Sequence, residues 1–330
     1  MSASLLRIED LTVEFESDFR RFRVVDGLSL TVDAGETVGL VGESGSGKTV
    51  TALSIMRLMD PRAQIVKGRI WFKEEDLLQK TEAEMRRVRG RRIAMVFQEP
   101  MTSLNPSYAV GEQVAEVFQY QLHTSRSDAK RRALDVFDRV KLPSPRTVYT
   151  KYPHELSGGM RQRVMIAAAL ACKPDMLIAD EPTTALDVSI QAQILALLQE
   201  IQAALGMAVL FITHNLEVVA ELCERVAVIY GGKLVEIGAV DTMFRSPAHP
   251  YTEGLLRSIP RRGQTLRPIT GAIFDPQFPP SGCHFHPRCA YAQGRCREDG
   301  PMLKPLSRVG SEAGARITQL VSCHYPILER

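Results

Sequence analysis

The chain lacks any apolar run long enough to cross a membrane. Its best uninterrupted run covers residues 164–172, far short of the roughly 20 residues that a spanning helix needs. The N-terminal stretch reaches Arg7 before a long apolar core can form, so it does not have the pattern of a signal peptide. We therefore expect a cytosolic chain whose contacts with a membrane go through partner subunits.

A strong charge excess is also missing. The 330 residues carry a formal net charge of +3, which neither requires a nucleic-acid partner nor excludes a membrane-associated one. Internal repeats and low-complexity tracts are absent as well. The hydrophobic share of 45% and the charged share of 24% are ordinary for a soluble globular protein. The length predicts one large domain with an appended module.

Cysteine is scarce and unevenly placed. Two of the six cysteines, Cys172 and Cys223, lie in apolar stretches, where they are expected to be buried small side chains. The other four gather near the C-terminus, and in a reducing cytosol such a group indicates a metal before a disulfide. These four are Cys283, Cys289, Cys296 and Cys323.

Strand and helix patterns alternate along much of the chain. Between residues 190 and 205, apolar residues recur at the spacing of a crossover helix that packs on a sheet. Short apolar runs are typical of buried parallel strands. Such runs lie at residues 37–41, 176–179, 208–213 and 226–230, and further strands are expected at 5–15, 24–32, 69–72 and 92–97. The pattern predicts an α/β core.

Two stretches depart from this alternation. Residues 99–163 are polar, mostly helical in pattern and interrupted by prolines, so we expect a helical insert. From about Asp241 the alternation stops and proline becomes frequent, which indicates the appended module. The predicted domains are residues 1–98 and 164–245 for the α/β core, 99–163 for the helical subdomain and 246–330 for a C-terminal extension.

The segment GESGSGKT at residues 42–49 fits the phosphate-binding loop pattern G-x-x-x-x-G-K-[ST] in full. A strand pattern precedes it and a helix pattern follows, so a glycine-rich turn that binds nothing is the weaker interpretation. Glycines let the backbone curl around phosphate oxygens with its N–H groups pointing inward. Lysine can reach the β- and γ-phosphates, and the threonine hydroxyl can ligate Mg²⁺. The predicted nucleotide-binding residues are Gly42, Ser44, Gly45, Ser46, Gly47, Lys48 and Thr49.

Two carboxylates follow the apolar strand pattern at residues 176–179. In parallel sheets, ligands bind at the carboxyl ends of the strands. Asp180 is therefore expected to coordinate Mg²⁺, and Glu181 to orient or deprotonate the attacking water. A strand that ends in two acids is weak evidence alone, because it is often only a solvated strand end, but it is strong beside a phosphate-binding loop.

The segment LSGGMRQR at residues 156–163 resembles the signature sequence of the ABC ATPase family, in which most members carry Gln at the position of Met160. Gln98 is similar to the family's loop glutamine, which senses Mg²⁺ and contacts the membrane subunits. The segment ALD ending at Asp187 is similar to the loop that crosses the dimer interface. His214 is similar to the switch histidine that contacts the γ-phosphate. An isolated histidine is more often structural, but the position of His214 in this series of motifs favours the functional interpretation.

This resemblance covers about residues 5–245. It implies a P-loop NTPase fold, a RecA-like ABC ATPase core with a helical subdomain, that binds ATP and Mg²⁺. It also implies a head-to-tail dimer, in which Ser157, Gly158 and Gly159 of one subunit face the γ-phosphate bound to the other. The family stacks an aromatic ring on adenine; Phe15 is the candidate, Phe22 is the alternative, and core packing of Phe15 is equally open.

Three segments narrow the resemblance to the ATPase subunits of dipeptide and oligopeptide importers, in the form of the first subunit of a pair. They are FQEPMTSLNP at residues 97–106, HELSGGMRQR at 154–163 and HPYTEGLL at 249–256. The resemblance implies two integral membrane permease subunits, a second ATPase subunit in a heterodimer or homodimer, and an extracytoplasmic solute-binding protein acting indirectly. It also implies a peripheral location at the cytoplasmic face of the inner membrane.

Other functions remain open at this point. The same branch handles nickel chelates, glutathione and some sugars, and the ATPase does not touch the solute. A soluble ABC ATPase acting on ribosomes or DNA is a rival, although neither a second ATPase unit nor a coiled-coil insert is present in the sequence. A small-molecule kinase would need no signature segment. The basic run at residues 85–92 lacks interleaved aromatics, so we expect a solvated face and no nucleic-acid partner.

The C-terminal cysteines resemble the cysteine module of these importer subunits. Four thiolates are the usual complement of a [4Fe–4S] cluster. The spacing matches neither ferredoxin pattern, and it lacks the paired C-x-x-C of many zinc sites. The prediction is a [4Fe–4S] cluster held by the four cysteines, with zinc or free thiols as alternatives. Replacement ligands for zinc are His284, His286 and His324.

Overall fold

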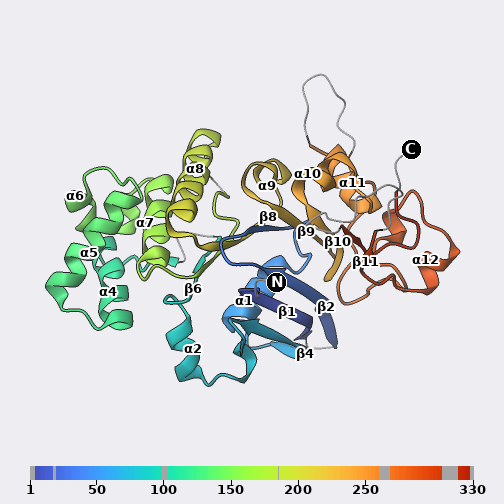
Figure 1. The fold of residues 1–330 in the computed structure, drawn as a ribbon, viewed down its shortest axis with the longest axis horizontal. Helices are drawn as coiled ribbons and strands as arrows, with labels where there is room; N and C mark the ends of the chain where they lie inside the picture. Colours follow the sequence, from blue (N-terminus) through green and yellow to red (C-terminus); the bar gives the residue numbers. More distant parts are fainter. Residues whose placement is uncertain are drawn as a thin grey trace. The chain divides into compact units, whose positions relative to one another are not determined.

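The computed structural model describes residues 4–17, 20–98, 103–184, 186–259, 268–306 and 319–327 (Figure 1). These residues form two compact units. The first unit comprises Met1–Val32, Thr37–Leu78 and Ile212–Arg330, and the second comprises Asp33–Glu36 and Gln79–Phe211. The predicted division into core, helical subdomain and extension cuts the chain at other points and stays a prediction.

One antiparallel sheet of the first unit has the strand order β2-β1-β4-β5. Its strands are β1 (Leu6–Glu16), β2 (Arg21–Val32), β4 (Ala63–Phe72) and β5 (Glu75–Asp76). Alternating apolar residues of β1, such as Leu6 and Ile8, are fully buried, which is the pattern of a strand with one face toward the core. Strand β4 begins well before residue 69, where the sequence pattern placed it, because its first half mixes polar with apolar residues, none of them buried, and so lacks the pattern of a core strand.

Five more strands of the first unit lie in the order β3-β9-β10-β12-β11. They are β3 (Thr37–Val41), β9 (Arg225–Tyr230), β10 (Lys233–Ala239), β11 (Lys304–Pro305) and β12 (Leu320–Val321). The central pair, β3 and β9, is parallel, and every residue of β3 is buried. The β9–β10 hairpin turns through Gly231 and Gly232, whose φ angles are 52° and 82°, as a two-residue turn with two left-handed positions requires.

The C-terminal extension is attached to this sheet by a buried acid. Glu236 of β10 accepts hydrogen bonds from the backbone N–H groups of Ala248 at 2.8 Å and His249 at 2.9 Å. It therefore satisfies donors at the start of helix α11. The helices of the first unit are α1 (Lys48–Met56), α9 (Leu216–Leu222), α10 (Val240–Arg245), α11 (Pro250–Arg257) and α12 (Gly294–Glu298).

The second unit combines parallel strands with most of the long helices (Figure 1). Strands β6 (Ile93–Val96) and β7 (Met176–Asp180) pair in parallel, and β8 (Ala208–Thr213) follows next to β7. The expected helical stretch forms α4 (Val110–Leu122), α5 (Arg126–Arg139), α6 (Pro145–Tyr149) and the start of α7 (Gly158–Leu170); α2 (Glu82–Val88) precedes it and α8 (Val188–Leu205) follows.

By length and composition, one helix among the described residues, α8, could span a bilayer. Its buried residues are Ile194, Leu195, Leu197 and Leu198. Apolar residues of the helix are therefore packed against the protein, as the helical spacing in the sequence predicted. The core helices of soluble proteins have the same composition, and the observation alone does not indicate a membrane span.

Candidate nucleotide-binding site

The phosphate-binding loop runs from the end of β3 to the start of α1 in the first unit. A side chain on Gly42 would place its Cβ 2.2 Å from the carbonyl oxygen of Ile229, and one on Gly47 would lie 2.7 Å from that of Val24. Both distances are too short for any Cβ, and Gly47 also has a φ of 104°, which disfavours other residues. The two pattern glycines are thus required by close backbone approach.

Two polar side chains of this loop, those of Ser46 and Lys48, are buried, while Ser44 and Thr49 are exposed. The Lys48 ammonium donates to the carbonyl oxygens of Gly42 at 2.8 Å and Glu43 at 3.0 Å. The Ser46 hydroxyl is buried and has no hydrogen-bond partner among the described residues. A buried hydroxyl of this kind is a cost unless a ligand satisfies it, and a phosphate oxygen is a fitting partner. Thr49 follows at the start of α1.

The loop is also held by the C-terminal extension, which the sequence did not predict. The Glu43 carboxylate receives two hydrogen bonds from the Arg288 guanidinium, at 2.7 and 3.1 Å. The Glu43 backbone N–H donates to the Tyr251 hydroxyl at 2.9 Å. Glu43 occupies an unspecified position of the loop pattern. Tyr251 lies in a segment that indicated the family branch, and Arg288 lies in the cysteine segment that indicated a metal site, so pattern reasoning had no reason to join them.

A cavity of about 400 Å³ opens beside the phosphate-binding loop in the first unit. Phe22 and Gly45 line it, together with Phe274, Gln277 and other residues of the extension. Phe15 does not line this cavity; its ring stacks on Phe22 at 6.2 Å between centroids. Of the two aromatic candidates from the sequence, Phe22 lines this cavity and Phe15 does not, and the adenine role of either ring stays a prediction.

His214 belongs to the first unit as well. It is exposed and lies between the end of β8 and α9. The neighbouring Asn215 begins that helix, since its side chain accepts from the Glu217 N–H at 2.9 Å. An exposed histidine at the carboxyl end of a strand is placed where a ligand can reach it, but its γ-phosphate role stays a prediction.

The second unit brings Gln98 and Glu181 together. The Gln98 Nε2 donates to Glu181 Oε2 at 3.3 Å, and the Thr184 hydroxyl donates to the same oxygen at 2.9 Å. Glu181 has a φ of 45°, which is sparsely populated for a residue with a side chain. Such strain is found at functional sites, where surrounding contacts hold it in place. The neighbouring Asp180 is almost fully buried at the end of β7.

The signature segment lies at the start of α7. Ser157 precedes the helix and its hydroxyl accepts from the Met160 N–H at 3.3 Å, which is an ordinary helix cap. Ser157 and Gly158 are exposed. Gly159 is half-buried, and it lies so close to the Ile190 side chain that an added Cβ would be 2.7 Å from it. Asp187 is also exposed, at the start of α8. Ala185 of the aspartate loop and residues 99–102 of the importer motif lie outside the described residues.

The four C-terminal cysteines line one small pocket in the first unit, with His286 and His324. Among the described residues, no three histidine, cysteine or acidic side chains are close enough together to hold a single metal ion. Burial raises the pKa of Cys283 and Cys289, and it raises the pKa of Cys323 to about 12. Of the other two cysteines, Cys223 is buried as expected and Cys172 is only half-buried.

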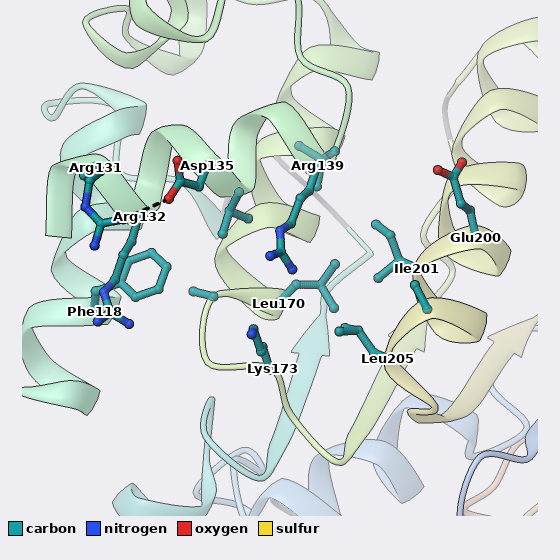
Figure 2. Close-up of a pocket in the computed structure, with 14 residues that line it drawn as sticks. Phe118, Arg131, Arg132, Asp135, Arg139, Leu170, Lys173, Glu200, Ile201 and Leu205 are labelled. Carbon is teal, nitrogen blue, oxygen red and sulfur yellow. Dashed lines mark hydrogen bonds and ion pairs between the residues drawn. The ribbon is translucent and has the colours of Figure 1, made fainter. Parts of the chain in front are cut away.

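A second cavity, of about 540 Å³, lies within the second unit among α4, α5, α7 and α8. Figure 2 shows its apolar floor, which includes Leu170, Ile201 and Leu205, and its basic rim, where Arg139 and Lys173 point into the space. None of the predicted site residues lines this cavity.

The basic run at residues 85–92 is partly neutralised in the second unit. Arg89 donates two hydrogen bonds to the Glu82 carboxylate, at 2.6 and 3.2 Å. The Arg86 Nε lies 3.7 Å from Glu82 Oε1. These pairs lower the positive charge available for a polyanion. The expectation of no nucleic-acid partner stays a prediction.

The phosphate-binding loop, the carboxylates after β7 and the mixed α/β fold define a nucleotide-hydrolysing protein of the P-loop class. Comparison with known proteins narrows the class. Residues 25–184 match the ABC transporter family, and residues 235–296 match the oligopeptide/dipeptide transporter C-terminal region.

Relatives and solved structures agree with these two matches. A probable peptide ABC transporter ATP-binding protein of Sinorhizobium fredii is 48% identical over 96% of both chains. The dipeptide transport ATP-binding protein of Escherichia coli is 45% identical over 98% of this chain and 97% of its own. A dimeric ATP-binding cassette bound to ADP and Pi has a TM-score of 0.65 at 26% identity, covering 71% of this chain and 98% of that one.

The chain belongs to the ABC transporter ATP-binding family, in the branch that carries the oligopeptide/dipeptide transporter C-terminal region. It is an ABC-type ATPase, and the predicted fold class and family are confirmed.

Proposed function

We propose that this chain is the ATP-hydrolysing subunit of an ABC importer for dipeptides or oligopeptides. The proposal is carried by one observation: similarity to peptide import ATP-binding proteins extends over nearly the whole chain, and it includes the C-terminal region characteristic of that branch. Because the ATPase does not contact the solute, the substrate class is inferred from the relatives and not from the site.

In the proposed reaction, the phosphate-binding loop holds the nucleotide, with Lys48 neutralising phosphate charge. Glu181 orients or deprotonates the attacking water, and its strained backbone and two hydrogen bonds support that role because they restrict where the carboxylate points. His214 contacts the γ-phosphate. Gln98 lies where a change at Glu181 can be relayed to neighbouring subunits, since the two side chains are hydrogen-bonded.

Mg²⁺ suits the oxygen donors present in the chain. The hydroxyl of Thr49, the carboxylate of Asp180 and the amide oxygen of Gln98 are hard oxygen ligands of the kind that Mg²⁺ takes. When bound, the ion would neutralise charge on the β- and γ-phosphates. The position of Asp180 at the carboxyl end of β7 supports its part in the site, because ligands bind at this end of the strands in parallel sheets.

The active form in this proposal is a head-to-tail dimer with a second ATPase subunit, identical or not. The exposed Ser157, Gly158 and Asp187 support it, because these polar and small residues are open to a partner. The dimer works with two integral membrane permease subunits at the cytoplasmic face of the inner membrane, and a solute-binding protein acts from the other side. This arrangement is supported by the similarity to a peptide ABC transporter ATP-binding protein and to an ATP-binding cassette whose solved structure is dimeric.

The test is ATPase activity after reconstitution in liposomes with the permease subunits and any partner ATPase. Solute-binding protein is added either empty or loaded with short peptides. Stimulation by the peptide-loaded form alone is the expected result. Intact basal activity with no response to peptides would contradict the peptide assignment, and the same assay would then be run with nickel chelates, glutathione and sugars.

We also propose that Cys283, Cys289, Cys296 and Cys323 hold a [4Fe–4S] cluster. Support comes from their position around one small pocket. A cluster spreads its four cysteine bonds over four iron atoms and so accepts thiols that are spaced too widely for one zinc ion. A bound cluster would cross-link segments that are far apart in the sequence.

Iron and sulfide analysis of anaerobically purified protein tests the cluster. We expect a brown protein with about four iron atoms per chain, and loss of the iron in Cys289→Ser. Colourless protein with zinc in place of iron would replace the cluster by a zinc site, and protein without either metal would leave free thiols.

A further inference from the structure

The C-terminal extension contacts the phosphate-binding loop through an ion pair in which the arginine is buried and the glutamate is partly exposed. The Arg288 side chain is only 5% exposed and makes a bidentate contact with the Glu43 carboxylate, with N–O distances of 2.7 and 3.1 Å. Its Nε also donates to the Thr270 carbonyl oxygen at 3.2 Å, and Nη1 lies 3.4 Å from the Tyr230 hydroxyl. A bidentate contact between an arginine and a carboxylate holds a fixed geometry.

Glu43 in turn determines the position of the loop lysine. Its carbonyl oxygen accepts from the Lys48 ammonium at 3.0 Å and from the Ser46 backbone N–H at 3.2 Å. Its own backbone N–H is occupied by the Tyr251 hydroxyl. A shift of Glu43 would therefore move the groups that are expected to meet the phosphates, namely Lys48 and the first turn of the loop.

A carboxylate in a phosphate-binding loop is unfavourable by itself. Its negative charge would repel the phosphate groups across a short distance in a partly buried site. Arg288 supplies the matching positive charge from the extension, so the Glu43 carboxylate adds no net negative charge to the loop.

We infer that Arg288 is a positioning residue of the nucleotide site: the cysteine-bearing extension sets the geometry and the local charge of the phosphate-binding loop through Glu43, and so sets nucleotide affinity. This inference rests on the proposed nucleotide site. Since Cys289 directly follows Arg288, the contents of the cysteine site lie one residue from this contact.

Four variants of the full chain test the inference, with fluorescent ADP titration and steady-state ATPase kinetics as readouts. Arg288→Gln leaves Glu43 without its counter-charge, and we expect the Kd for ADP and the KM for ATP to rise roughly tenfold or more. Because the loss is in binding, kcat should change little. Arg288→Lys keeps the charge but loses the bidentate geometry, so its Kd should be intermediate.

The double variant Glu43→Gln with Arg288→Gln removes both charges, and we expect it to bind ADP more tightly than Arg288→Gln alone. Arg257→Gln is the matched control, because that arginine lies in the same extension with an ion pair to Glu253 but is 55% exposed; its Kd should equal that of the unmodified chain. If Arg288→Gln does not fold by circular dichroism, Arg288→Lys and the double variant decide the question.

The inference would be overturned, and the proposed function left standing, if Arg288→Gln bound ADP as tightly as the unmodified chain. If Arg288→Gln does not fold, unchanged affinity in both Arg288→Lys and the double variant would have the same meaning. A drop in kcat and melting temperature at constant KM would also overturn it, because that result describes structural support only. Failure of the unmodified chain to bind ADP would instead contradict the proposed nucleotide site.

Discussion

The phosphate-binding loop and the signature segment are both glycine-containing turns that lead into a helix, yet they are built differently. The loop is closed: Gly42 and Gly47 lie against backbone carbonyl groups, Lys48 bonds within the loop and Glu43 is held by Arg288. The signature segment is open, with Ser157 and Gly158 exposed and one ordinary helix cap.

This difference is what the proposed dimer requires. A loop that binds the nucleotide of its own subunit can be organised in advance by contacts within its own chain, which lowers the cost of binding. A segment that meets the nucleotide of another subunit has to stay accessible until the dimer closes. Variants that affect the chemical step, the phosphate-binding loop and the signature segment separately test whether the two segments differ in this way.

The largest effect is expected from Glu181→Gln, which keeps the shape of the side chain but removes its basicity. Hydrolysis should fall by at least about a hundredfold, while ADP and ATP still bind because the phosphate-binding loop is unchanged. Single-turnover ATPase measurements with parallel nucleotide titrations check this. Glu116→Gln, an exposed acid on α4, serves as the control, and near-normal turnover of Glu181→Gln would exclude Glu181 as the group acting on water.

Gly42→Ala should damage the closed loop itself. The new Cβ would lie 2.2 Å from the Ile229 carbonyl oxygen, so the backbone has to shift at a cost of about 1–3 kcal/mol. We expect a lower melting temperature and nucleotide affinity reduced roughly tenfold or more. Thermal unfolding with and without ADP measures both quantities.

The control for this variant is Gly294→Ala, where a Cβ meets nothing within 4 Å. Equal melting temperatures for the two variants would show that the close approach at Gly42 relaxes without cost, and the contrast between closed loop and open segment would lose its main support.

Ser157→Asp tests the open segment. Aspartate caps a helix as well as serine does, so the isolated chain should keep its stability and its affinity for ADP. In the assembled transporter, the added charge would face the γ-phosphate of the partner subunit and should lower ATPase activity about tenfold. Ser125→Asp is the matched control, since Ser125 caps α5 with the same type of bond. Unchanged activity of assembled Ser157→Asp would argue against the proposed dimer.

The smallest effect concerns stability of the helical part at high pH. Burial, together with the nearby Glu112 carboxylate, raises the pKa of Tyr149 to about 12. Because this folded-state pKa exceeds the unfolded value of about 10, the contribution to stability is present below about pH 10 and is lost as the pH rises to about 12. Tyr149→Phe should therefore approach the unmodified chain in stability over that range.

Urea unfolding at a series of pH values measures the difference. Tyr120→Phe is the control, because Tyr120 is 65% exposed. If the free energies of unfolding of Tyr149→Phe and the unmodified chain differ by a constant amount from about pH 8 to about pH 12, the phenol has the same pKa in the folded and unfolded states.

Much of the fold was predictable because its strands are continuous apolar runs. The predicted strands at residues 37–41 and 208–213 match β3 and β8 residue for residue, and α1 begins at Lys48 directly after the loop glycines. Strand β10 was not predicted, since the buried acid Glu236 interrupts its apolar pattern. That acid is explained only by the donors of Ala248 and His249, which come from a later segment.

The sequence by itself determined the chemistry of the protein: a loop pattern for phosphate, two acids after an apolar strand, and four clustered cysteines are local features that depend on residue type and spacing. The contact between the C-terminal extension and the phosphate-binding loop is visible only in the tertiary structure. The contact between Glu43 and Arg288 joins residues far apart in the chain, and no periodicity or motif encodes a partner at such a distance, because an ion pair depends on where two side chains meet in space and not on their spacing in sequence.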